Sequence, residues 1–172
     1  MKKNLIAVVT VRKGSQRVKN KNFKPFGGKN LLIHKIETLK KVKNLDEIVI
    51  NTDSEEAIDV AKNFKISYKK RDPYFASSEC SNSEFWQNVA ENTDSEYIIF
   101  THCTNPMIKV STYEDTIKKF QDLKEKHDSL NTVTEIKEFL YLKNRPINFD
   151  PSKSPNSMLF PAVSQSNLIS NR

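Results

Sequence analysis

Short runs of apolar, mostly β-branched residues recur along this chain of 172 residues, and segments with helical spacing separate them. A continuous apolar run is typical of a strand that is buried on both faces of a parallel sheet. The alternation predicts an α/β fold, a doubly wound, mainly parallel sheet with helices on both faces and right-handed crossovers. The expected strands are 5–10, 47–51, 66–68, 97–100 and 130–136, and the expected helices are 31–42, 54–64, 82–90 and 111–126.

The loop after the first apolar run is the strongest candidate for a binding site. In parallel α/β sheets, ligands bind beyond the carboxyl ends of the strands. A glycine there lets the backbone bring N–H groups close to a phosphate, and arginine and lysine neutralise its charge. The loop therefore predicts a polyphosphate site, with a solvated basic turn as the alternative. Beside Gly14 and Ser15 it holds five cations, Arg12, Lys13, Arg17, Lys19 and Lys21.

Positive charge is concentrated at one end of the chain. Residues 1–43 contain 13 Lys and Arg against one acid, Glu37, whereas the other 129 residues contain 15 against 20, which gives the net charge of +7. Such focused charge suits a small polyanion or a nucleic-acid backbone. No aromatic stacking platform accompanies the cations, which argues against a module that binds nucleic acid.

The remaining composition indicates a cytoplasmic protein. No apolar run approaches the ~20 residues that span a bilayer, so no membrane segment is expected. The basic start of the chain resembles the beginning of a signal peptide, but the apolar run after it breaks at Arg12 and no cleavage site follows, so no export signal is expected. Cys80 and Cys103 lack the spacing of a metal site or a disulfide framework and suit free thiols in a reducing compartment.

The pattern of strands and helices fades toward the end of the chain. Residues 1–143 are expected to form one nucleotide-binding domain. Residues 144–172 hold four of the seven prolines, many Ser and Asn, and no helical period. Two interpretations stay open for this segment, an extended arm that packs on a partner subunit and a disordered tail.

The residues of the basic loop also resemble a known signature. Arg12-x-Gly14-Ser15-x-Arg17-Val18-x-x-Lys21-Asn22 after an apolar strand is similar to the loop of the CMP-sugar synthetases, the acylneuraminate and 3-deoxy-manno-octulosonate cytidylyltransferases. The resemblance covers most of residues 5–140 and implies a Rossmann-like nucleotidyltransferase fold. It continues through Leu31-Leu32, Ile48 to Asp53, Ala61 to Phe64, Arg71 with Ala76-Ser77, and Cys103 to Pro106.

The resemblance implies an enzyme that joins CTP to sialic acid or a related acidic sugar, releases pyrophosphate, uses Mg²⁺ and forms a homodimer. Arg12 and Lys21 would be catalytic, because they would stabilise the leaving pyrophosphate. His102, Thr104 and Asn105 would face the acceptor sugar. The residues expected to bind the nucleotide are Arg12, Gly14, Ser15, Arg17, Lys21, Asn22, Arg71, Cys80 and Asn82.

The chain also departs from the family pattern. His102 stands where sialic-acid members have glutamine, Ile108 where they have arginine, and Lys19 where they have proline. Family members continue past this length with paired aspartates that hold the metal, and residues 164–172 supply none, so the metal ligands are not assigned. The alternative to an active enzyme is a nucleotide-binding remnant. Either Asp53 or Ser54 is expected to cap the helix that follows. For Asp53, a role as helix cap or structural carboxylate is favoured over a role as metal ligand.

Overall fold

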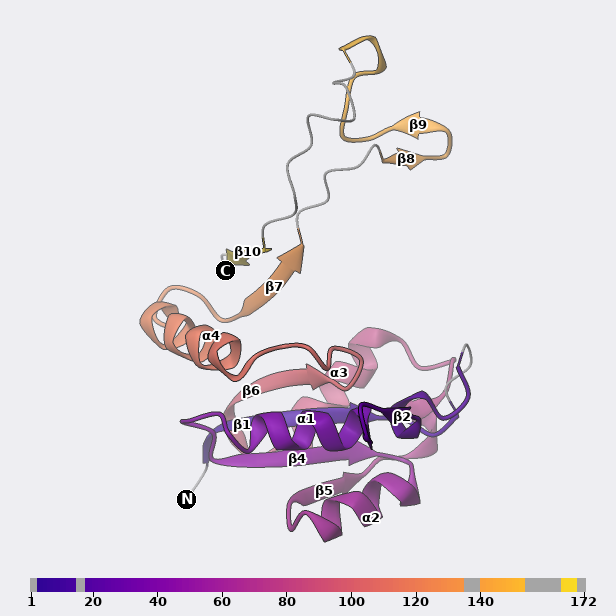
Figure 1. Ribbon diagram of the computed structural model, residues 1–172. Coiled ribbons are helices and arrows are strands. Elements are labelled where there is room, and N and C mark those ends of the chain that lie inside the picture. Colours follow the sequence, from indigo (N-terminus) through magenta and orange to yellow (C-terminus); the bar gives the residue numbers. More distant parts are fainter. Residues whose placement is uncertain (1–2, 15–17, 135–139, 154–164, 170–172) are drawn as a thin grey trace. The chain divides into compact units, whose positions relative to one another are not determined.

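The computed structural model describes residues 3–14, 18–134, 140–153 and 165–169 (Figure 1). The chain divides into two compact units, residues 1–117 and 118–172, and each is described by itself. The boundary that the sequence places after residue 143 stays a prediction. All the candidate site residues belong to the first unit.

Four parallel strands form the sheet of the first unit in the order β5-β4-β1-β6. Because β1 lies inside the sheet, its apolar side chains are almost completely buried, as the continuous run predicts. The pairing places Thr10 of β1 opposite both Asn51 of β4 and His102 of β6, so the carboxyl ends of these strands share one edge. The strands are β1 (Lys3–Val11), β4 (Glu47–Thr52), β5 (Ser67–Lys70) and β6 (Ser95–His102).

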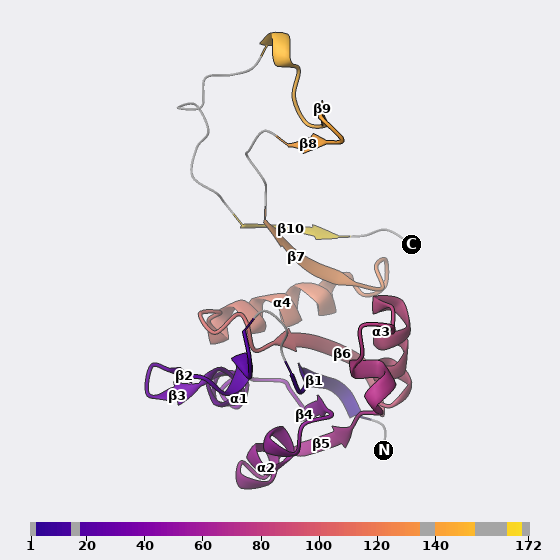
Figure 2. The same cartoon turned by 90° about the vertical axis from the view of Figure 1, so that its right-hand side faces the viewer.

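Helices cover both faces of this sheet, and Figure 2 shows α1 and α3 on opposite sides of it. One core lies on the side of α1, where Leu32 and Ile36 are fully buried; α2 and the start of α4 also contribute to it. The other core lies under α3, with Val89 packed on β1 and β4. The doubly wound prediction is therefore confirmed. The helices are α1 (Leu31–Leu39), α2 (Glu55–Asn63), α3 (Asn82–Glu91) and α4 (Val110–Leu123).

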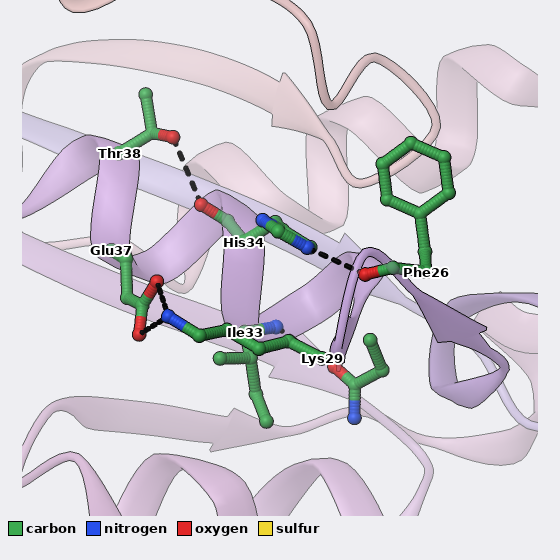
Figure 3. A network of polar contacts seen from close by, with 7 residues as sticks. Phe26, Lys29, Ile33, His34, Glu37 and Thr38 are labelled. Atoms are coloured by element: carbon green, nitrogen blue, oxygen red, sulfur yellow. Dashed lines mark hydrogen bonds and ion pairs between the residues drawn. The ribbon is translucent and has the colours of Figure 1, made fainter.

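A small hairpin joins the basic loop to α1, and side chains of that helix fasten it (Figure 3). Its two-residue turn is Gly27-Gly28, with φ of 55° and 80°, values that favour glycine. His34 Nε2 donates to the Phe26 carbonyl at 2.7 Å, and Lys29 pairs with Glu37 at 2.6 Å. The elements before α1 are the 3₁₀ turn η1 (Lys21–Phe23), β2 (Pro25–Phe26) and β3 (Lys29–Asn30).

The second unit contains two antiparallel pairs of strands. Residues 165–169 form a strand that pairs with β7, so this part of the expected arm or tail has regular structure. Packing on a partner subunit stays a prediction. Across the part of the chain that the structure describes, no helix has the length and apolar character to cross a membrane. The elements are β7 (Leu130–Thr134), β8 (Tyr141–Leu142), β9 (Arg145–Pro146), the 3₁₀ turn η3 (Pro151–Lys153) and β10 (Gln165–Ile169).

Helix α3 begins with a reciprocal cap. The Ser81 hydroxyl accepts from the Glu84 N–H at 3.2 Å, and the Glu84 carboxylate accepts from the Ser81 N–H at 2.9 Å. A capping box of this kind satisfies two backbone donors that the helix itself leaves free. Between β5 and α3, the chain forms the 3₁₀ turn η2 (Pro73–Ala76).

Replacing the cap should destabilise the protein. Ser81→Ala is expected to lower the free energy of unfolding by about 1 kcal/mol, because it removes the side-chain acceptor at the helix start. Ser83→Ala is the matched control, since Ser83 is an exposed residue of the same helical turn and alanine favours a helix. Urea unfolding of both variants measures the effect. Equal stability of the two variants would contradict the role of the cap.

Candidate functional site

The loop after β1 turns at a glycine and returns through a short 3₁₀ turn. Gly14 has φ of 71° and Asn20 has φ of 51°, both in the left-handed region that glycine and asparagine tolerate best. The turn η1 then carries Lys21, which is half-buried, and Asn22, which is buried. Two further predicted phosphate ligands, Ser15 and Arg17, lie outside the described residues.

This loop forms one wall of a pocket of about 390 Å³ at the carboxyl end of β1. Three of the predicted site residues, Arg12, Lys21 and Asn22, meet there. The opposite wall is the turn from β4 into α2, which also follows the carboxyl end of a strand. The lining residues are Arg12, Lys13, Asn20, Lys21, Asn22, Phe23, Asp53, Ser54, Glu55, Glu56 and Lys70.

Asp53 connects the two walls of this pocket. Its Oδ1 accepts a hydrogen bond from the Lys13 N–H at 2.8 Å and lies 3.4 Å from Arg71 Nη2. The prediction that this carboxylate is structural is consistent with these contacts. Of the two residues predicted to cap α2, Ser54 is the N-cap and Asp53 is not. The Ser54 side chain makes no capping hydrogen bond, and the Asp53 carboxylate accepts from the Lys13 N–H of the β1 loop.

Arg71 is held on several sides although it carries a charge in the interior. Its Nη2 also donates to the Val11 carbonyl at 2.7 Å, and its guanidinium lies 5.1 Å from the centre of the Phe85 ring. Burial lowers the pKa of Arg71 below its ordinary value, and the charge of Asp53 opposes this change. The side chain is 3% exposed and its Nε has no hydrogen-bond partner within the described residues. These contacts fix the guanidinium beside the end of β1.

The remaining residues predicted to contact the base lie in the segment that leads into α3. Cys80 is half-buried, and its thiol donates to the Ser81 carbonyl, whereas Asn82 is the exposed first residue of α3. Neither residue lines the pocket of 390 Å³. Arg12 approaches this side of the site, because its Nη1 lies 3.4 Å from the Ala76 carbonyl in η2.

The predicted acceptor residues follow the neighbouring strand end. His102 is the last residue of β6, and its ring contacts Trp86 of α3 with centroids 6.0 Å apart. Thr104 and Asn105 are exposed in the turn after it. Their backbone lies at the same edge of the sheet as the basic loop, since Thr10 pairs with His102. None of the three lines the pocket of 390 Å³.

A buried lysine lies beneath that turn. Lys35 of α1 is 1% exposed, and its Nζ donates to the Asn105 carbonyl at 2.9 Å and to the Tyr113 hydroxyl at 2.7 Å. Burial lowers the pKa of Lys35 to about 8, and the neighbouring Cys103 opposes this change. Burial raises the pKa values of Cys103 and Tyr113 to about 12, so both stay protonated at neutral pH.

The described residues do not contain a cage of side chains for the expected Mg²⁺. No group of three or more His, Cys, Asp or Glu side chains there is placed to hold a metal ion. Asp53 already accepts from Lys13 and Arg71, and Glu55 pairs with Lys70 at 2.5 Å. Mg²⁺ is commonly bound through one or two carboxylates together with substrate phosphates, so the metal stays a prediction.

Several residues near the site were not predicted from the sequence. Lys70 and the acidic turn at 55–56 line the pocket but belong to other segments than the glycine loop. Lys35 had a visible signal, because it is the one cation within the apolar stripe of its helix. The contact of Phe85 with Arg71 depends on tertiary packing and had no signal in the sequence.

The shifted pKa of Lys35 predicts a dependence of stability on pH. Between pH 7 and 9 the unfolded chain keeps its Lys35 proton, because its pKa there is 10.5, while the folded protein loses it near pH 8. The penalty for burying the charge is thus largest below pH 8 and falls as the pH rises. The free energy of unfolding of wild type, minus that of Lys35→Met, should rise by roughly 1 kcal/mol from pH 7 to 9.

Urea unfolding at several pH values in this range measures that difference. The window stays below the range in which Tyr113 titrates, and Cys103 is present in both proteins, so its contribution largely cancels. A difference that is constant from pH 7 to 9 would contradict the burial of a titrating Lys35.

Comparison with known proteins shows which family the chain resembles in sequence. Residues 6–160 match the family described as Cytidylyltransferase. N-acylneuraminate cytidylyltransferase of Escherichia coli is 27% identical over 135 residues, which are 78% of this chain and 32% of that protein. Pseudaminic acid cytidylyltransferase of Campylobacter jejuni is 31% identical over 124 residues, which are 69% of this chain and 53% of that protein. The chain thus spans a third to a half of these relatives.

Solved structures share the fold at lower identity. A CMP:2-keto-3-deoxy-manno-octonic acid synthetase complexed with CTP superposes with a TM-score of 0.67 at 16% identity, over 95% of this chain and 71% of that one. A 4-diphosphocytidyl-2C-methyl-D-erythritol synthase gives a TM-score of 0.63 at 14% identity, over 98% and 75%. These two likenesses concern the fold alone. The match over residues 6–160 shows that the chain belongs to the cytidylyltransferase family.

Proposed function

We propose that this chain forms the nucleotide-binding part of a CMP-sugar synthetase, which transfers CMP from CTP to sialic acid or a related acidic sugar and releases pyrophosphate. One observation carries the proposal: Arg12, Lys21 and Asn22 line a pocket at the carboxyl end of the first strand. That is where doubly wound sheets bind nucleotides. The named activities of the curated relatives, on sialic and pseudaminic acids, support the substrate class.

The nucleotide would lie along the loop after β1. Arg12 and Lys21 would contact the phosphates and stabilise the negative charge that develops on the leaving pyrophosphate. The turn at Gly14, with Ser15 and Arg17 beside it, would supply further donors. Asn22 would also contact the triphosphate, and for the base we propose Arg71 with the segment from Cys80 to Asn82.

The acceptor would approach from the end of β6. Its hydroxyl oxygen attacks the α-phosphorus of CTP, the bond from that phosphorus to the β-phosphate bridging oxygen breaks, and the hydroxyl proton is released. Because the reaction needs two substrates in line, most of the catalysis would come from positioning and from charge neutralisation. His102, Thr104 and Asn105 are the residues that we propose for contacts with the sugar.

The same proposal includes a metal ion and an oligomeric state. Mg²⁺ would accompany CTP, since the described residues do not form a metal cage of their own. We propose a cytoplasmic homodimer, in which the second unit contributes to the contact between subunits. Light scattering after gel filtration measures this state, and a monomer at all concentrations would contradict it.

Release of pyrophosphate tests the proposed activity. With CTP, Mg²⁺ and sialic acid, pseudaminic acid or 3-deoxy-manno-octulosonic acid, the chain is expected to release pyrophosphate with at least one acceptor and not with ATP in place of CTP. Lys21→Ala should slow this release about 100-fold, because it removes a donor to the leaving group. Lys24→Ala is the control, since Lys24 is exposed and does not line the pocket.

Two results would contradict the proposal. Equal rates for Lys21→Ala and Lys24→Ala would remove Lys21 from the site. Absence of pyrophosphate with every acceptor, in a chain that still binds CTP, would instead favour the nucleotide-binding remnant.

A further inference from the structure

Helix α1 supports segments on two of its sides. On one side, His34 of α1 donates to the Phe26 carbonyl and Glu37 of α1 pairs with Lys29. The helix thereby holds the hairpin that follows Lys21 (Figure 3). On the buried side, Lys35 reaches the turn after β6 through the Asn105 carbonyl. The same helix therefore joins the phosphate side of the pocket to the strand end that carries the predicted acceptor residues.

The turn after β6 has few other internal anchors. Cys103 is buried and Ile108 packs against the core, but the side chains of Thr104, Asn105 and Met107 are exposed. The Asn105 N–H lies 3.4 Å from the His102 carbonyl, at the long end of hydrogen-bond distances. The Lys35 contact of 2.9 Å is shorter and comes from an ammonium group, so it is the stronger restraint on this backbone.

A lysine in this position is costly for folding, because an ammonium group loses its hydration inside the protein. An apolar side chain of similar volume would fill the space beneath the turn without that cost. The two hydrogen-bond partners of Lys35 come from separate elements, the turn at Asn105 and helix α4 at Tyr113. The lysine therefore links α1, this turn and α4 through directed hydrogen bonds, which an apolar residue could not form.

We propose that Lys35 is a positioning residue, which holds the turn 103–109 in place at the carboxyl end of β6, where Thr104 and Asn105 lie at the same edge of the sheet as the end of β1. The hydroxyl of Tyr113 orients the ammonium group, and the Asn105 carbonyl is the point on the turn that it holds. The identity of the turn as the acceptor side rests on the proposed function, whereas the link itself rests on the contacts alone.

Hydrogen exchange of the turn tests the link without any activity. In Lys35→Met, the turn amides that are protected in wild type, such as that of Asn105, which lies 3.4 Å from the His102 carbonyl, should exchange about tenfold faster, because a charged hydrogen bond that restrains the turn is lost. Tyr113→Phe keeps the ring but lacks the hydroxyl and should give a smaller increase. Lys41→Met, at an exposed lysine after the same helix, should exchange as wild type does.

Exchange in Lys35→Met at the wild-type rate would overturn the proposal. If Lys35→Met does not fold, Tyr113→Phe decides: faster exchange of the same amides supports the link, and an unchanged rate overturns it. A general increase across β1 and α3 in either variant would show a loss of stability rather than a release of the turn, and would also overturn it.

Kinetics connect the link to the reaction. Lys35→Met should raise KM for the acceptor sugar about tenfold and leave KM for CTP within about twofold, because the turn lies on the acceptor side. An equal rise in both values would overturn the positioning role. If wild type itself releases no pyrophosphate, the proposed function fails, and the exchange experiment still decides whether Lys35 holds the turn.

Discussion

The carboxylate of Asp53 holds together the ends of three neighbouring strands. It follows β4, accepts from the backbone after β1, and lies beside Arg71, the residue after β5. Arg71 in turn donates to the carbonyl of Val11, the last residue of β1. Removing the carboxylate would leave a guanidinium in the interior without its counter-charge, so the geometry of these three strand ends depends on this pair.

Charge in the candidate pocket comes from both walls. The described lining carries four cations, Arg12, Lys13, Lys21 and Lys70, and three carboxylates, Asp53, Glu55 and Glu56. Lys70 is paired with Glu55, and the hydrogen bond of that pair lowers the pKa of Glu55. An anion is therefore favoured on the side of Arg12 and Lys21, away from the acidic turn. This distribution of charge would orient a polyphosphate as well as attract it.

The sequence predicted the fold well, because the two inner strands, β1 and β4, are almost completely buried and read as apolar runs. It also predicted the cationic loop, since Gly14 and the cations around it lie close together in the chain. The sequence could not show that Asp53 would turn toward this loop instead of capping α2. The orientation of the Asp53 carboxylate depends on the backbone N–H of Lys13, which is 40 residues away in the chain. Lys35 was visible as a cation in an apolar stripe, but its partners could be identified only from the packed structure.

Calorimetric titration of this chain with CTP and with ATP, each with Mg²⁺, tests whether the end of β1 is a cytidine nucleotide site. We expect saturable binding of CTP and at least tenfold weaker binding of ATP, since a site that pairs with one base leaves polar groups unmatched against another. Equal affinity for the two nucleotides would contradict a cytidine site. Absence of binding to either would contradict the assignment of this pocket.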